Sequence, residues 1–182
     1  GGLTMSRAAA ESRRTMVSDP AKPNRDQYAD AAGAHDYRRL VNGPNVMVYE
    51  TPPLDRDLRV VGNIEARITF ETDAPSIDVW AKLLDVGPDG TAWNVMSAGL
   101  DVERVDRPES PHQVVLRNLL TGNLFKRGHR IRLVVMNSFM PNFSRNPQTG
   151  RSETVESSTR PARFTVLHGA GYDSYLALPV IP

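Results

Sequence analysis

The sequence contains no cysteine among its 182 residues, which excludes disulfide bonds and thiolate zinc sites. It also lacks an apolar run of the roughly 20 residues that a membrane-spanning helix needs, and its first residues lack the apolar core of a signal peptide. The sequence therefore predicts a soluble chain with no membrane as partner, and it leaves the cellular location open.

A surplus of charge of either sign is also missing. The chain has 22 basic and 21 acidic residues, which gives a formal net charge of +1. Such a chain has no overall field that would attract nucleic acid, so no nucleic-acid partner is expected. With 40% hydrophobic and 24% charged residues, the composition is typical of one globular domain.

Sequence motifs for catalysis are scarce. Residues 95–99 (VMSAG) come nearest to a nucleophile elbow but lack its first glycine and fall in a predicted strand, so Ser97 is interpreted as structural. No glycine-rich phosphate loop occurs. Four acidic residues in irregular chain could bind calcium, but solvation is the better interpretation: Asp19, Asp26, Asp30 and Asp36. The histidines show no metal-ligand spacing: His35, His112, His129 and His168. We predict no catalytic residue, metal or cofactor.

Strand patterns dominate from residue 46 onward. In residues 58–72, Ile64, Ala66, Ile68 and Phe70 alternate with polar residues, as in a strand with one buried face. Residues 87–90 (GPDG) form a turn signal after a strand at 76–86, and residues 91–105 return across it as a hairpin. Further strands are predicted at 46–50, 113–120, 130–135, 162–167 and 175–181, with turns at 121–123 and Gly128. The pattern indicates an all-β, two-sheet antiparallel sandwich.

The first 44 residues are less regular. Residues 5–16 favour a short helix only weakly, because their apolar residues form no stripe. Residues 18–24 contain two prolines and are expected to be extended, and residues 35–40 suggest one helical turn. We therefore predict a linker or strap with little regular structure over 1–44 and a sandwich domain over 45–182.

The loop at residues 137–150 has an unusual composition for a solvated connection. It follows a predicted core strand and contains prolines and asparagines, which cannot continue a ladder, together with two phenylalanines. We predict that it packs against another surface through these residues: Asn137, Phe139, Asn142, Phe143, Arg145 and Asn146. The alternative is that both phenylalanines fold under the loop into the domain's own core, and for Phe143 this interpretation is nearly as good.

The two tryptophans could form a sugar-binding platform if both were exposed. Trp80 lies in a strand and shares a face with Lys82 and Leu84, while Trp93 follows the predicted hairpin turn. Core or interface packing is favoured over ligand stacking for both.

Several segments together carry a family resemblance. They are residues 48–54 (VYETPPL), 81–90 (AKLLDVGPDG), 125–133 (FKRGHRIRL), 141–150 (PNFSRNPQTG) and 178–182 (LPVIP), supported by 1–4 (GGLT) and 18–21 (SDPA). In this order they resemble the C-terminal domain of the X-Pro dipeptidyl-peptidase group of serine hydrolases, which includes cocaine esterases and α-amino acid ester hydrolases. The resemblance covers residues 16–182.

The resemblance implies a galactose-binding-like jelly roll that packs on an α/β-hydrolase catalytic domain and helps enclose its active site. It also implies that the Ser-His-Asp triad lies upstream, outside this sequence. The family often has a longer, glycine-rich segment between Pro23 and Leu40. Because residues 24–35 are short and polar here, no substrate-contact residue is assigned.

Two functions remain open from the sequence. The first is an accessory domain of an ester- or amide-cleaving serine hydrolase, and the alternative is an autonomous carbohydrate-binding jelly roll, since a fold does not fix a function. A homo-oligomer is possible. The sequence does not identify the acyl or leaving group of a substrate, the organism, or whether the chain is part of a longer protein.

Overall fold

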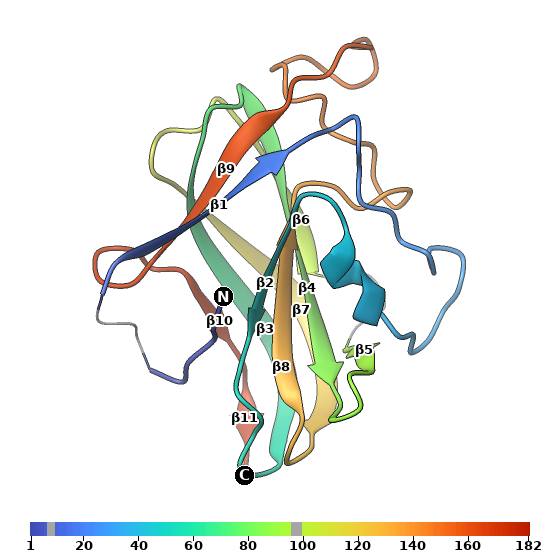
Figure 1. Ribbon diagram of the computed structural model, residues 1–182, viewed down its shortest axis with the longest axis vertical. Coiled ribbons are helices and arrows are strands. Elements are labelled where there is room, and N and C mark those ends of the chain that lie inside the picture. Colours follow the sequence, from blue (N-terminus) through green and yellow to red (C-terminus); the bar gives the residue numbers. More distant parts are fainter. Residues whose placement is uncertain (7–9, 96–99) are drawn as a thin grey trace.

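Two antiparallel β-sheets pack face to face (Figure 1), as predicted from the alternation. The computed structural model describes residues 1–6, 10–95 and 100–182. Its elements are β1 (Ser12–Ser18), η1 (Arg38–Asn42), β2 (Val46–Glu50), β3 (Leu58–Thr72), β4 (Ser76–Val86), β5 (Ala92–Asn94), β6 (Leu100–Asp106), β7 (His112–Phe125), β8 (Arg130–Met136), β9 (Ala162–His168), β10 (Tyr175–Ala177) and β11 (Val180–Ile181).

The six-stranded sheet is built around β3. One edge of β3 pairs with β7, and the other edge pairs in turn with β9, β10 and β11. Strand β1 pairs with β9 at the outside of this sheet, and the two lie side by side in Figure 1. The galactose-binding-like character stays a prediction.

The five-stranded sheet is built around β4. One edge of β4 pairs with β8, which in turn pairs with β2, and the other edge pairs with β5 and β6. The predicted turn after β4 is present: the amide of Gly90 donates to the carbonyl of Gly87 over 2.9 Å. Gly90 has a φ of 82°, a conformation that favours glycine.

The main core lies between the sheets. Ile64, Ala66, Ile68 and Phe70, the residues whose alternation predicted a buried face, are at most 3% exposed. They belong to one cluster with inward-facing residues of β4 and β8, among them Leu83 and Val135. The period-two pattern therefore identifies the core face of β3 correctly.

The helix suggested for residues 5–16 is wrong for its second half. Ser12–Ser18 form β1, in which Arg14 and Met16 lie opposite Val166 and Phe164 of β9. Met16 packs against the main core. Pairing with an available sheet edge outweighs the weak helical preference of this segment, because it supplies both hydrogen bonds and burial.

The turn predicted at residues 121–123 is also wrong. These residues continue β7, with Gly122 opposite Val61 of β3, and the strand ends at the fully buried Phe125. Residues 91–105, expected as one returning strand, instead form β5 and β6, which both pair with β4. The turn at Gly128 is present, where the amide of His129 donates to the carbonyl of Lys126 over 3.0 Å.

Residues 19–44, hereafter the outer strap, cross the outer face of the five-stranded sheet. Tyr37 and Leu40 of this strap are buried in a second apolar cluster with Trp80, Val134 and other outward-facing residues of β4 and β8. The outer strap contains η1, near the predicted helical turn. This sheet is thus covered on both faces, while the division of the chain at residue 44 stays a prediction.

Among the described residues, no helix has the length and apolar character needed to span a membrane.

Candidate functional site

The 137–150 loop is fixed at both ends to the start of β4. The side-chain amide of Asn137 donates to the backbone carbonyl of Asp78 over 2.7 Å, and that of Asn146 donates to the Asp78 carboxylate over 2.8 Å. The hydroxyl of Ser76 donates to Asn146 Oδ1 over 2.9 Å. Asn137 and Asn146 are both buried, so these two predicted contact residues anchor the loop within the domain.

The loop is also joined to the outer strap, and both segments lie on the same side of the molecule (Figure 1). The amide of Met140 donates to the carbonyl of Asn24 over 2.9 Å, and the amide of Asp26 donates to the carbonyl of Met140 over 2.6 Å. The Arg145 guanidinium donates to the carbonyl of Pro20 over 3.0 Å. These bonds make the loop and the strap one surface.

The two phenylalanines of the loop have different environments. Phe139 is 2% exposed and lies between Trp80 and Tyr37, with ring centroids 6.0 and 6.4 Å away. Phe143 is 49% exposed and meets Trp80 edge to face at 4.7 Å. Phe139 was expected at an interface, with packing into the domain's own core as the alternative. It is part of the core, where Tyr37 of the strap lies over it. Phe143, for which core packing was the alternative, is at the surface.

Lys82 lies beneath this surface and was not singled out by the sequence. Its side chain is 1% exposed, and its Nζ is 4.2 Å from the ring centroid of Tyr37 and 5.3 Å from that of Phe139. Within the described part of the chain, Nζ has no hydrogen-bond partner. Burial lowers the pKa of Lys82 to about 8, partly offset by the Asp26 carboxylate. The sequence contains a sign of this burial, because the apolar residues Trp80 and Leu84 flank Lys82 on the same face of β4.

The exposed part of the predicted site is small. Asn142 and Phe143 are at the surface and Arg145 is half-buried. Asn142 Nδ2 donates to Asp26 Oδ2 over 3.2 Å, which ties it to the strap. Of the six predicted residues, three are buried within the domain and three are available to a partner: Asn142, Phe143 and Arg145.

Asp78, which anchors the loop, is the second residue that the sequence did not indicate. Its side chain is 8% exposed. Burial raises the pKa of Asp78 to about 6, against the opposing effects of the Asn146 hydrogen bond and the Arg104 charge. Between pH 4 and 6 the folded chain therefore holds a proton at this carboxyl that the unfolded chain releases.

We expect the free energy of unfolding to carry a contribution from Asp78 that is fully present below about pH 4 and lost as the pH rises through 6. Between pH 4.5 and 7 the loss is about 2 kcal/mol. Asp78→Asn removes this contribution while keeping an acceptor for Asn146. Urea unfolding of the wild type and the variant at pH 4.5 and 7 measures this loss. An equal change in the free energy of unfolding of the two proteins between these pH values would contradict the assignment to Asp78.

The other candidates from the sequence have structural partners. The ring of His35 stacks on Tyr28 at 4.4 Å, and His129 Nδ1 lies 2.8 Å from Asp85 Oδ1. Trp80 is buried, whereas Trp93 is 45% exposed. Ser97 lies outside the described residues. In the part of the chain that is described, no three His, Asp or Glu side chains are grouped as metal ligands.

The described residues form an antiparallel two-sheet sandwich domain, in which one loop is held against the outer strap. Comparison with known families identifies its family: the description "X-Pro dipeptidyl-peptidase C-terminal non-catalytic domain" belongs to a family model that matches residues 3–177. The chain belongs to this family, as the resemblance predicted.

Known relatives carry this region as part of longer proteins. The cocaine esterase of Rhodococcus sp. (strain MB1 Bresler) is 29% identical over 204 residues, which cover 100% of this chain and 34% of the esterase. A crystal structure of an aminopeptidase from the marine sediment archaeon Thaumarchaeota archaeon is 27% identical with a TM-score of 0.83, covering 97% of this chain and 34% of that one. An α-amino acid ester hydrolase structure is 25% identical with a TM-score of 0.85, covering 100% and 35%. The chain spans about a third of the length of these relatives.

Proposed function

We propose that this chain is the C-terminal domain of a longer serine hydrolase of the α/β type that cleaves ester or amide bonds. In that protein it packs on the catalytic domain and helps to enclose the active site. The observation that carries the proposal is the family match over residues 3–177. Its relatives are named as an esterase, an aminopeptidase and an ester hydrolase, and the chain covers about a third of the length of each.

We further propose that the 137–150 loop contacts the catalytic domain through Asn142, Phe143 and Arg145. The side-chain anchors at Asn137 and Asn146 support this, because a loop that is already fixed loses little conformational entropy when it binds. An exposed aromatic residue beside a guanidinium is also a typical composition for the centre of an interface.

The outer face of the six-stranded sheet is a second exposed apolar surface. Arg59, Val61 and Asn63 alternate on one face of β3, and their partners in β7 and β11 share that face. The exposed apolar residues there are Val61, Leu120, Leu124 and Ile181. This surface serves as the control when binding by the loop is tested. The homo-oligomer that the sequence left possible stays a prediction.

Two measurements test the proposed function. The purified chain is expected to hydrolyse a nitrophenyl acyl ester no faster than buffer, because it contains no recognisable nucleophile, base and oxyanion donors. The hydrolase region encoded with this chain, expressed as a separate polypeptide, is expected to bind it in calorimetric titration. Turnover by the chain alone, or the absence of a hydrolase region from the gene, would contradict the proposal.

An autonomous carbohydrate-binding domain is the alternative function. Of its two candidate platform residues, Trp80 is 2% exposed and Trp93 is 45% exposed. The burial of Trp80 favours the accessory-domain proposal, since stacking on a sugar requires an open aromatic face. Saturable binding on a glycan array that Trp93→Ala abolishes would favour the alternative instead.

A further inference from the structure

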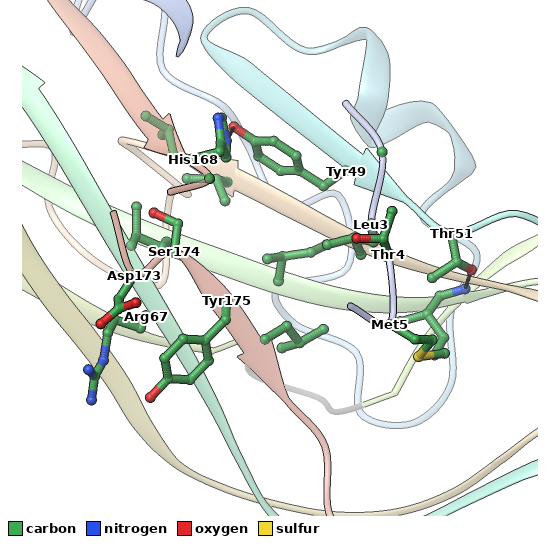
Figure 2. A pocket seen from close by; sticks show the side chains of 18 of the residues that line it. Leu3, Thr4, Met5, Tyr49, Thr51, Arg67, His168, Asp173, Ser174 and Tyr175 are labelled. Carbon is green, nitrogen blue, oxygen red and sulfur yellow. Dashed lines mark hydrogen bonds between the residues drawn. The ribbon is translucent and has the colours of Figure 1, made fainter. Parts of the chain in front are cut away.

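A pocket of about 430 Å³ opens between the two sheets on the side where β10 lies, and it is called the β10 pocket below (Figure 2). Its floor consists of core residues from both sheets: Ile68 and Val166 from the six-stranded sheet, and Ile131, Leu133 and Val135 from the five-stranded sheet. Among the described residues that line it, none belongs to the 137–150 loop or to the outer strap. The β10 pocket is therefore distinct from the surface that the loop and the strap form.

Several apolar side chains that line the pocket keep part of their surface in solvent. Leu3, Leu176 and Leu178 pack against the main core but are only partly buried, and Met5 is 77% exposed. Removing apolar surface from water is favourable in proportion to its area, and a concave apolar surface of this kind is typical of a contact site. The domain therefore gains from a partner that fills the pocket.

The two ring residues with polar atoms in the pocket wall are paired with each other. His168 Nε2 lies 2.9 Å from the hydroxyl of Tyr49, and its Nδ1 lies 3.3 Å from the carbonyl of Ser12. A carbonyl only accepts, so Nδ1 carries the proton and the Tyr49 hydroxyl donates to Nε2. Burial lowers the pKa of His168 and raises that of Tyr49 to about 12, so both are neutral near pH 7.

The hydroxyl groups of the wall also have partners within the domain. The Ser174 hydroxyl donates to the carbonyl of Leu167 over 2.7 Å and accepts from the amide of Thr69 over 2.9 Å. The Thr51 hydroxyl accepts from the amide of Ile131 over 3.0 Å. A charged or strongly polar occupant would lose its hydration without gaining these groups as partners, so the pocket favours apolar side chains.

Two charged residues complete the lining, and neither changes this preference. The guanidinium of Arg67 belongs to the outer face of β3, where it lies 4.9 Å from the ring centroid of Tyr175 and 3.7 Å from Glu65 Oε1. Asp173 is exposed, and Figure 2 shows it beside Arg67. The apolar floor therefore remains the surface that an occupant would cover.

The first residues of the chain are fixed beside the pocket by backbone hydrogen bonds to β2 and its end. The nitrogen of Gly1 donates to the carbonyl of Val48 over 2.8 Å, and the amide of Glu50 donates to the carbonyl of Gly1 over 3.1 Å. The amide of Leu3 donates to the carbonyl of Glu50 over 2.8 Å, and Leu3 itself lines the pocket. Residues that precede Gly1 in a longer protein therefore start close to the pocket.

We propose that the β10 pocket is a docking site for the hydrolase region, which places aliphatic or aromatic side chains on the apolar floor. The inference rests on the proposed function, in which this chain is a C-terminal domain and the hydrolase region precedes Gly1. Because Gly1 is fixed beside the pocket, the covalent link holds that region at a high effective concentration there. The contact is separate from the one proposed for the 137–150 loop.

The test compares the alkylation of single-cysteine variants in this chain alone and in the full-length protein, and it uses the absence of cysteine from this chain. Leu176→Cys places a thiol on the pocket side of β10. Ala177→Cys is the matched control, because Ala177 is exposed on the other face of β10, opposite Glu65. Iodoacetamide is the reagent, and mass spectrometry of the β10 peptide measures the rate separately from any cysteine elsewhere in the full-length protein.

We expect the Leu176→Cys thiol to react in the chain alone and roughly tenfold or more slowly in the full-length protein, since reactivity follows exposure. Ala177→Cys is expected to react at the same rate in both. Leu178→Cys, which also lines the pocket, replaces Leu176→Cys if that variant does not fold.

Three results would overturn the inference. The first is an equal rate for the pocket thiol in the two proteins, and the second is no reaction in the chain alone, which would show a closed pocket. The third is protection in the chain alone that increases with its concentration, which would assign the pocket to a second copy. A full-length protein that hydrolyses a nitrophenyl acyl ester while its pocket thiol stays reactive would retain the proposed function and reject only this inference.

Discussion

Phe139→Ala is expected to lower the free energy of unfolding by about 3–5 kcal/mol, the usual range for deleting a buried phenylalanine. The ring of Phe139 is 2% exposed and fills the space between Trp80, Tyr37 and Lys82. The substitution leaves a cavity that the strap cannot close without breaking its bonds to the loop. Urea unfolding measures this change, provided that the free energy of unfolding falls with urea concentration at the same slope in both proteins.

Phe143→Ala is the control for this prediction. Phe143 has the same chemistry and lies in the same loop, but its side chain is 49% exposed. We expect a loss of less than about 1 kcal/mol, because most of its surface is already in water. Similar losses for the two variants would show that the strap does not bury Phe139 in solution.

Lys82 is expected to make the domain more stable as the pH rises above 8. Burial lowers the pKa of Lys82 to about 8, below its ordinary value near 10.5. Between these two values the unfolded chain holds a proton that the folded chain has released, so the free energy of unfolding increases with pH. From pH 7 to 9.5 the increase is about 2 kcal/mol.

Lys82→Met isolates this contribution, since methionine retains an unbranched apolar stem without the charge. The variant is expected to be more stable than the wild type at pH 7 and to lose that advantage by pH 9.5. Measurements stop there because burial also raises the pKa values of Tyr37 and Tyr49, whose ionisation would lower stability at higher pH. A constant difference between the two proteins across this range would contradict the buried, charged state of Lys82.

The strands with clear alternation were predictable from sequence because burial on one face is a local pattern. β2, β3 and β4 occupy the predicted residues. β1 was not predictable, because Arg13 and Arg14 hide its alternation and its pairing partner β9 lies about 150 residues away. Residues 121–123 carry turn-forming types, yet they pair along β3, and no local signal reports that pairing.

The 137–150 loop was recognisable by its composition, but the environment of each side chain was not. Whether Phe139 or Phe143 is buried depends on the course of the outer strap, which contacts the loop from more than 100 residues earlier in the chain. Lys82 is covered by Tyr37 of the strap and Phe139 of the loop, and Trp80 is covered by Phe139 and Phe143. Sequence periodicity identifies the outward face of β4, but only the tertiary structure shows that this face is covered.

Calorimetric titration of variants against the hydrolase region tests most directly whether the 137–150 loop docks on a catalytic domain, as we propose. Phe143→Ala and Arg145→Ala are each expected to weaken association by about 1–2 kcal/mol. Leu120→Ser, on the outer face of the six-stranded sheet and 75% exposed, is the matched control and should bind like the wild type. Unchanged affinity in both loop variants, or a loss confined to Leu120→Ser, would contradict the account.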